Sequence, residues 1–163
     1  MTGRGLAVAL TGALTLSLAV AAPAAAAEPR LGPYGYGKLK IGQTKSQARG
    51  TGLIVLKRRD GGCTGFDLKT HRTGRDQVGG YISKKFGVVA IFARKGMKTP
   101  RGITLGSTKA QVKKAYPALR EDINVWWVPA PGSKKKTQYW FLFDRKNKVY
   151  ELGLVSPKQD CFN

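Results

Sequence analysis

Residues 37–48 read GKLKIGQTKSQA, and residues 102–112 read GITLGSTKAQV. Both stretches contain two apolar residues in alternation, then a glycine, and then Thr-x-x-Gln. A second pair of similar stretches, residues 82–93 and 143–154, follows in the same order and at nearly the same spacing. Recurrence of two blocks in one order indicates two copies of a single structural unit.

The Thr-x-x-Gln motif is typical of a capping box at the start of a helix. In a capping box the Thr side chain accepts a hydrogen bond from the backbone three residues later, and the Gln side chain reaches back to the cap. We therefore expect Thr44 and Gln47 to cap one short helix, and Thr108 and Gln111 to cap a second. Helix capping explains the recurrence of these residues better than a catalytic role does.

Strands fill the rest of each copy. Runs rich in β-branched and aromatic residues, separated by turn residues, predict strands at 63–69, 78–84, 88–93, 123–128, 138–143 and 148–155. A helix followed by an antiparallel meander, twice, predicts an α+β fold made of two tandem helix-plus-antiparallel-sheet repeats. The copies are expected over residues 37–100 and 101–163.

Residues 1–27 have the pattern of a secretory signal peptide. Arg4 precedes an uncharged apolar stretch, and small residues end the segment with Ala25-x-Ala27. The apolar stretch is short for a membrane span, which needs about 20 predominantly apolar residues. We expect a secreted or extracytoplasmic product with no transmembrane segment after signal removal, and a flexible mature N-terminus over residues 28–36.

The two cysteines, Cys63 and Cys161, form an even pair in a chain expected to reach an oxidising compartment. That setting favours a disulfide. Closing a loop of roughly 100 residues would stabilise the fold by about 4 to 5 kcal/mol. The alternative is two buried free thiols. Two thiols and one histidine fall short of the four ligands of structural zinc, so we expect no metal and no cofactor.

Few residues are available for catalysis, because the chain has nine acidic residues and one histidine. His71 lies in a basic turn with no convincing nucleophile beside it. Asp144 and Glu151 flank a predicted hairpin, where ion pairing explains them more simply than glycoside hydrolysis. We therefore expect a protein that is not an enzyme.

Positive charge is the strongest surface feature, with 29 basic against 9 acidic residues and a net charge of +20. Such a charge attracts acidic proteins and anionic envelope polymers, although it can also serve solubility alone. Secretion and the lack of a recognised motif argue against a specific nucleic acid. The basic residues that we expect to bind a partner lie in turns: Lys84, Lys85, Lys134, Lys135, Lys136, Arg145 and Lys146. The pairs Lys84-Lys85 and Arg145-Lys146 are expected at equivalent sheet ends of the two copies, and the run 134–136 belongs to the second copy alone.

Aromatic residues are concentrated in the second copy. Side chains alternate between the two faces of a strand, so Tyr139 is expected to face away from Trp140. One face packs under the helices, and the other is free to anchor a partner. The aromatic candidates for partner binding are Trp126, Trp127, Trp140 and Tyr150, and their complete burial is the alternative.

The apolar-x-apolar-Gly-x-Thr-x-x-Gln signature, the tandem unit, the signal peptide and the length resemble the secreted β-lactamase inhibitor proteins. They also resemble the related small outer-membrane assembly lipoproteins, which carry one such unit. The resemblance covers most of residues 37–163 and implies that the two sheets join into a concave, partner-binding surface. The chain departs from the inhibitor pattern in having one Cys per copy and a strongly basic surface.

Together these features predict a secreted, monomeric, non-catalytic binding protein. It would present a basic, aromatic sheet surface to an acidic protein or an anionic polymer. The alternatives are a proteinaceous inhibitor of a secreted enzyme such as a β-lactamase, and a cell-envelope scaffold protein.

Overall fold

The computed structural model describes residues 1–2, 30–134 and 136–162, with residues 58–60 described through their backbone alone. The predicted signal peptide, apart from its first two residues, lies outside the described residues. In the described part of the chain the fold is mostly β, with 38% strand and 10% helix. The strands form one eight-stranded antiparallel sheet and one three-stranded sheet.

The predicted α+β fold of two tandem helix-plus-antiparallel-sheet repeats is therefore wrong. The physical reason is the small share of helix beside eight strands that form one continuous sheet, in which β7 pairs directly with β11. The two described helices have six and seven residues, too few to form a layer of their own.

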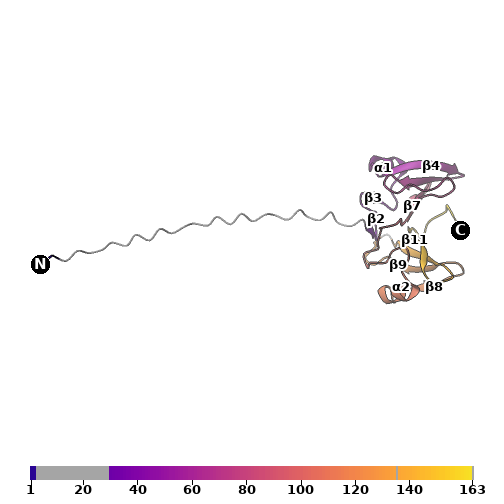
Figure 1. Cartoon of the computed structure of the whole chain (residues 1–163). Helices are drawn as coiled ribbons and strands as arrows, with labels where there is room; N and C mark the ends of the chain where they lie inside the picture. Colours follow the sequence, from indigo (N-terminus) through magenta and orange to yellow (C-terminus); the bar gives the residue numbers. More distant parts are fainter. Residues whose placement is uncertain (3–29, 135, 163) are drawn as a thin grey trace.

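The large sheet has the strand order β4-β5-β6-β7-β11-β10-β9-β8. Its strands are β4 (Ile54–Asp60), β5 (Cys63–Leu68), β6 (Gly80–Ser83), β7 (Gly87–Phe92), β8 (Arg120–Glu121), β9 (Trp126–Pro129), β10 (Gln138–Phe143) and β11 (Val149–Val155). The small sheet contains β1 (Leu31–Gly32), β2 (Gly35–Tyr36) and β3 (Leu39–Lys40). Figure 1 shows helix α1 (Lys45–Gly50) beside β4 and helix α2 (Lys109–Ala115) near β8, with β7 and β11 between them.

Both helices begin with a capping box. The Thr44 side chain accepts from the Gln47 backbone N–H at 3.2 Å, and Gln47 Oε1 accepts from the Thr44 backbone N–H at 2.9 Å. Thr108 and Gln111 make the same pair of bonds at 3.2 and 2.7 Å. These side chains are therefore engaged in starting helices. No helix in the described ranges is long and apolar enough to cross a membrane.

The core lies between the helix-bearing face of the large sheet and the small sheet. Its fully buried members include Leu31, Leu39, Phe66, Ile91, Val112, Tyr116, Tyr139, Phe141, Leu152 and Leu154. Burial of this apolar surface is the main source of stability in such a fold.

Residues 31–36, which belong to the expected flexible N-terminus, instead form β1, β2 and the turn between them. The reason is that Leu31 is fully buried in the core, where its carbonyl accepts from the Tyr139 hydroxyl at 2.8 Å. Its backbone N–H donates to the carbonyl of Lys98 at 2.8 Å. The segment is thus tied to both halves of the chain.

Candidate anion-binding site

The predicted basic clusters lie at two opposite ends of the sheet. Lys84 and Lys85 form the turn between β6 and β7, whereas Arg145 and Lys146 form the turn between β10 and β11. Because β7 and β11 run antiparallel, these two turns are at opposite ends of the paired strands. Each turn therefore precedes the corresponding strand of its half, and the antiparallel pairing of these two strands puts the turns at opposite ends of one sheet.

The loop between β9 and β10 lies at the same end as the β6–β7 turn. It carries Lys134 and Lys136, while Lys135 lies outside the described residues. We call this end of the sheet the lysine end. It combines two of the predicted clusters and leaves the third, Arg145 and Lys146, at the far end.

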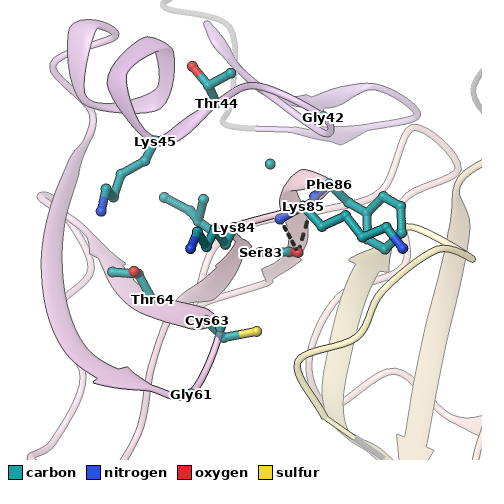
Figure 2. A pocket seen from close by; sticks show the side chains of 13 residues that line it. Gly42, Thr44, Lys45, Gly61, Cys63, Thr64, Ser83, Lys84, Lys85 and Phe86 are labelled. Atoms are coloured by element: carbon teal, nitrogen blue, oxygen red, sulfur yellow. Dashed lines mark hydrogen bonds between the residues drawn. The ribbon is translucent and has the colours of Figure 1, made fainter.

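A cavity of about 530 Å³ opens at the lysine end (Figure 2). Lys45, the first residue of α1, and Lys84 extend toward this hollow from different elements. Its lining also includes the polar residues Thr44, Thr64 and Ser83. The cavity thus combines ammonium groups with neutral hydrogen-bonding groups.

The β6–β7 turn is held in a fixed shape below its lysines. The buried Ser83 Oγ accepts from the backbone N–H groups of Lys85 and Phe86 at 3.0 and 3.1 Å (Figure 2). Gly87 has a φ of 71°, and a Cβ there would come within 2.4 Å of the Gln43 carbonyl oxygen. Glycine is therefore required at this close approach of two segments.

A second hollow, of about 620 Å³, adjoins the first and shares Gly42, Lys85 and Phe86 with it. The lysines that line it are Lys85, Lys134, Lys136 and Lys158. They come from the β6–β7 turn, the β9–β10 loop and the segment after β11. This convergence depends on tertiary structure, which is why the sequence reasoning missed Lys45 and Lys158.

The β9–β10 loop is anchored to the N-terminal segment. Thr137 Oγ1 donates to the Pro33 carbonyl at 2.6 Å, and the Tyr34 hydroxyl donates to the Gly132 carbonyl. Lys136 has a φ of 55°, a left-handed conformation that is uncommon for residues other than glycine. The loop backbone thus presents its lysines from a defined position.

The linings of these two hollows contain no aspartate or glutamate among the described residues. A described carboxylate nearby, that of Asp160, lines a separate hollow that shares Gly61, Gly62 and Cys63 with the first. Between residues that the structure describes, one ion pair occurs, at 3.5 Å between Lys57 Nζ and Asp67 Oδ2. The positive charge at the lysine end is therefore not neutralised within the described structure.

Asp67 belongs to a buried network under the loop between β5 and β6. Burial raises the pKa of this carboxyl, but hydrogen bonds from Thr73 and the nearby Lys57 ammonium outweigh it and hold the pKa below its ordinary value. Its oxygens accept from the Thr73 hydroxyl at 2.7 Å and the Gly79 N–H at 3.0 Å. Lys57 Nζ in turn donates to the Gln77 carbonyl at 2.6 Å. This network holds a loop and is separate from the lysine end.

The predicted aromatic residues do not form one cluster. Trp126 packs on the helix side, where Lys109 Nζ lies 3.7 Å from the centre of its ring. Trp127 and Trp140 are cross-strand partners on the opposite face, and both are half-buried. Tyr150 is 56% exposed. Only part of the predicted aromatic set is thus available to a partner.

The C-terminal segment covers part of this open face. Phe162 packs against Tyr81, Phe92 and Trp140, with ring centroids 5.4, 5.7 and 5.8 Å away. The sequence reasoning missed Phe162, although its position directly after Cys161 could have indicated it. The exposed aromatic surface is smaller than strand alternation alone predicts.

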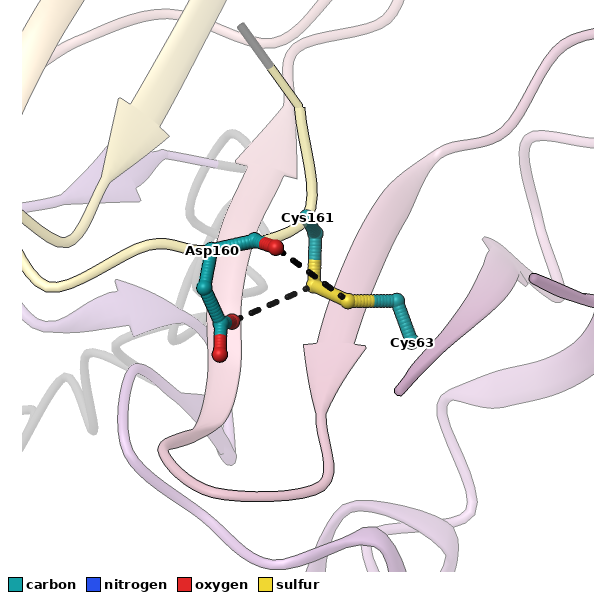
Figure 3. Close-up of side chains that lie close together, drawn as sticks. All are labelled: Cys63, Asp160 and Cys161. Atoms are coloured by element: carbon teal, nitrogen blue, oxygen red, sulfur yellow. Dashed lines mark hydrogen bonds between the residues drawn. A yellow bond between two sulfur atoms is a disulfide. The ribbon is translucent and has the colours of Figure 1, made fainter. Parts of the chain in front are cut away.

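The predicted disulfide is confirmed and fixes this segment. It joins Cys63 to Cys161 across 98 residues of sequence (Figure 3). Asp160 lies beside it, with Oδ1 3.7 Å from Cys161 Sγ. The two sulfur atoms are bonded to each other, so neither is a thiolate. Metal ligation by cysteine requires a thiolate. These three residues therefore do not form a metal site.

No protein-family model, curated protein or solved structure matches the chain. The function of the lysine end therefore has to be inferred from its own residues.

Proposed function

We propose that the protein is a secreted, non-catalytic binding protein that recognises an anionic macromolecule, either an acidic protein or an anionic envelope polymer. One observation carries the proposal. Lysines from separate segments converge at one end of the sheet. The described residues that line their two hollows include no carboxylate. A concentrated, uncompensated charge attracts anions over long range and speeds their association.

Two features support a location outside the cytoplasm. Disulfides persist mainly in oxidising compartments, and Cys63 is bonded to Cys161. The sequence of residues 1–27 has the pattern of a signal peptide. A secreted protein meets anionic polymers at the cell envelope, so this location and the proposed ligand agree with each other.

The test compares retention of the protein on a charged polymer and on the uncharged form of the same polymer. The chain without residues 1–27 would be passed over dextran and dextran sulfate in a salt series. We expect retention on dextran sulfate alone, and a binding constant whose logarithm falls linearly with the logarithm of salt concentration. Equal retention on the two surfaces would contradict the proposal.

A second candidate function is inhibition of a secreted enzyme, as the family resemblance implies. The observation that favours it is the half-buried pair Trp127 and Trp140 on the open face, since tryptophan is common at the centres of interfaces. Titration of a secreted serine β-lactamase with the chain would show stoichiometric loss of activity, weakened by Trp127→Ala. Full enzyme activity at saturating protein would exclude that enzyme as the target.

A further inference from the structure

The lysine end continues into a third hollow. This hollow, of about 700 Å³, is lined by Lys38, Lys40 and neutral residues, and it shares Gly42 with the other two. The three hollows therefore adjoin around one residue. Together they form what we call the lysine track, whose lysines are Lys38, Lys40, Lys45, Lys84, Lys85, Lys134, Lys136 and Lys158.

The lining of the lysine track is uniform in charge and in residue type. Its described lining residues include eight lysines, no arginine and no carboxylate. Arginine binds both carboxylates and phosphates through two parallel hydrogen bonds, whereas lysine binds phosphate as a compact point charge. A described lining that is charged through lysine alone therefore suits phosphate groups that are held by charge, without the paired hydrogen bonds that arginine would make.

The size of the lysine track suits an extended ligand. A single phosphate would occupy a small part of one hollow, and it would leave the lysines of the other two without a counter-charge. A chain of phosphate groups running through all three would place an anion beside lysines from the β3 region, α1, the β6–β7 turn, the β9–β10 loop and the C-terminal segment.

Aromatic stacking is scarce along the lysine track. Proteins that bind single-stranded nucleic acid stack bases on aromatic side chains. Phe86 is the one aromatic residue in the described linings of the three hollows, and Lys85 Nζ lies 5.0 Å from the centre of its ring. The lining thus offers positive charge to the phosphate backbone of a polymer, but little aromatic surface on which nucleic-acid bases could stack.

The segments that carry the lysines are held in place before any ligand arrives. The Ser83 hydroxyl fixes the β6–β7 turn, and Thr137 ties the β9–β10 loop to Pro33. Lys158 lies three residues before Cys161, whose disulfide anchors the C-terminal segment to β5. A prearranged site loses less conformational freedom on binding.

We propose that the lysine track binds a linear, base-free polymer of phosphate groups that extends through all three hollows. This inference rests on the proposed function and narrows it from anionic macromolecules in general to one class. The shared chemistry is a repeated phosphate, whether the polymer is an inorganic polyphosphate or a phosphodiester chain of small polyols.

The experiment measures binding of fluorescently labelled inorganic polyphosphate by anisotropy in a salt series. The track variant carries Lys85→Gln, Lys134→Gln and Lys158→Gln. The matched control carries Lys69→Gln, Lys95→Gln and Lys114→Gln, which removes the same charge from exposed lysines outside the lysine track. Thermal melts of both variants would check that the fold is retained.

For the track variant we expect a roughly 100-fold loss of affinity at low salt and a salt slope smaller by about 2 to 3. The control variant should keep binding within about threefold, since its charges are exposed and away from the ligand. Polyphosphate and a polyol phosphate should both bind, and their relative affinity would distinguish the two sources.

Several results would overturn the inference and leave the proposed function standing. These are equal losses in the two variants, tighter binding of polyglutamate at equal charge, or tighter binding of single-stranded oligothymidine. If the wild-type chain bound none of these polyanions, the proposed function would fall together with the inference.

Discussion

The two halves of the eight-stranded sheet are stabilised by different interactions. In the half built from β4 to β7, Asp67 and Lys57 form a buried polar network, and a disulfide ties Cys63 to the C-terminal segment. In the half built from β8 to β11, stability comes from aromatic packing, with Tyr116 5.8 Å from both Tyr139 and Phe141. Both halves bury apolar side chains, and the first half adds a few directional interactions to this burial. They should therefore respond differently to reductant and to pH.

The largest expected effect is on the disulfide of the first half. The double variant Cys63→Ser and Cys161→Ser should lower the free energy of unfolding by about 4 to 5 kcal/mol, because the bridge closes a long loop in the unfolded chain. Urea unfolding followed by tryptophan fluorescence would measure it. Loss of the bridge should also release Phe162 from Trp140 and shift the emission to the red. A change below about 1 kcal/mol would show that the loop-closure argument fails here.

The next effect concerns the buried network of the same half. Asp67→Asn should cost about 3 to 5 kcal/mol at neutral pH, because it leaves the Lys57 ammonium without its counter-charge. The matched change Asp76→Asn, at an exposed carboxylate of the neighbouring loop, should cost little. Chemical unfolding of the two variants would show whether the loss of stability depends on burial of the carboxylate that is replaced.

The same carboxyl predicts a pH dependence. The folded-state pKa of Asp67 lies below the unfolded value of 3.8, so its stabilisation is fully present above about pH 4 and is lost as the pH falls through the folded-state pKa. The difference in stability between the wild-type chain and Asp67→Asn should therefore shrink in acid. A difference that stays constant from pH 7 to pH 2 would assign the effect of the variant to packing.

The smallest effect distinguishes two buried tyrosines of the second half. Tyr139→Phe leaves the buried Leu31 carbonyl without its donor and should cost about 1 to 2 kcal/mol. Tyr116 is equally buried, but its hydroxyl makes no hydrogen bond of good geometry with the described residues. Tyr116→Phe should therefore be neutral or slightly stabilising. Thermal unfolding of both would test this ranking, and equal losses would contradict it.

Local features of the fold could be predicted from the sequence, and long-range pairings could not. The helix starts at Thr44 and Thr108 follow from hydrogen bonds within four residues, and β10 has the predicted bounds. The pairing of β7 with β11 has no local signal, because apolar alternation does not say which strand edges meet. That pairing places all eight strands in one sheet.

Strand β4 and the two strands β1 and β2 were missed for identifiable reasons. Strand β4 ends in Lys-Arg-Arg-Asp, and such a charged run does not have the apolar pattern by which a strand is predicted. Charged side chains are tolerated there because β4 is at the edge of the sheet. The glycine-rich segment around β1 and β2 reads as flexible, yet Leu31 is fully buried. For the site, the turn lysines Lys85 and Lys134 could be found from the sequence, whereas their position around one hollow could not.

The measurement that tests the central claim most directly reverses charge at the two opposite ends of the sheet. One variant carries Lys134→Glu and Lys136→Glu at the lysine end, and the other carries Arg145→Glu and Lys146→Glu at the far end. Both change the net charge equally, and surface plasmon resonance against an immobilised polyphosphate would give their association rates across a salt series. A large slowing and a flatter salt dependence for the first variant alone is the predicted result. Equal rates for the two variants would show that net charge, and not the lysine end, governs binding.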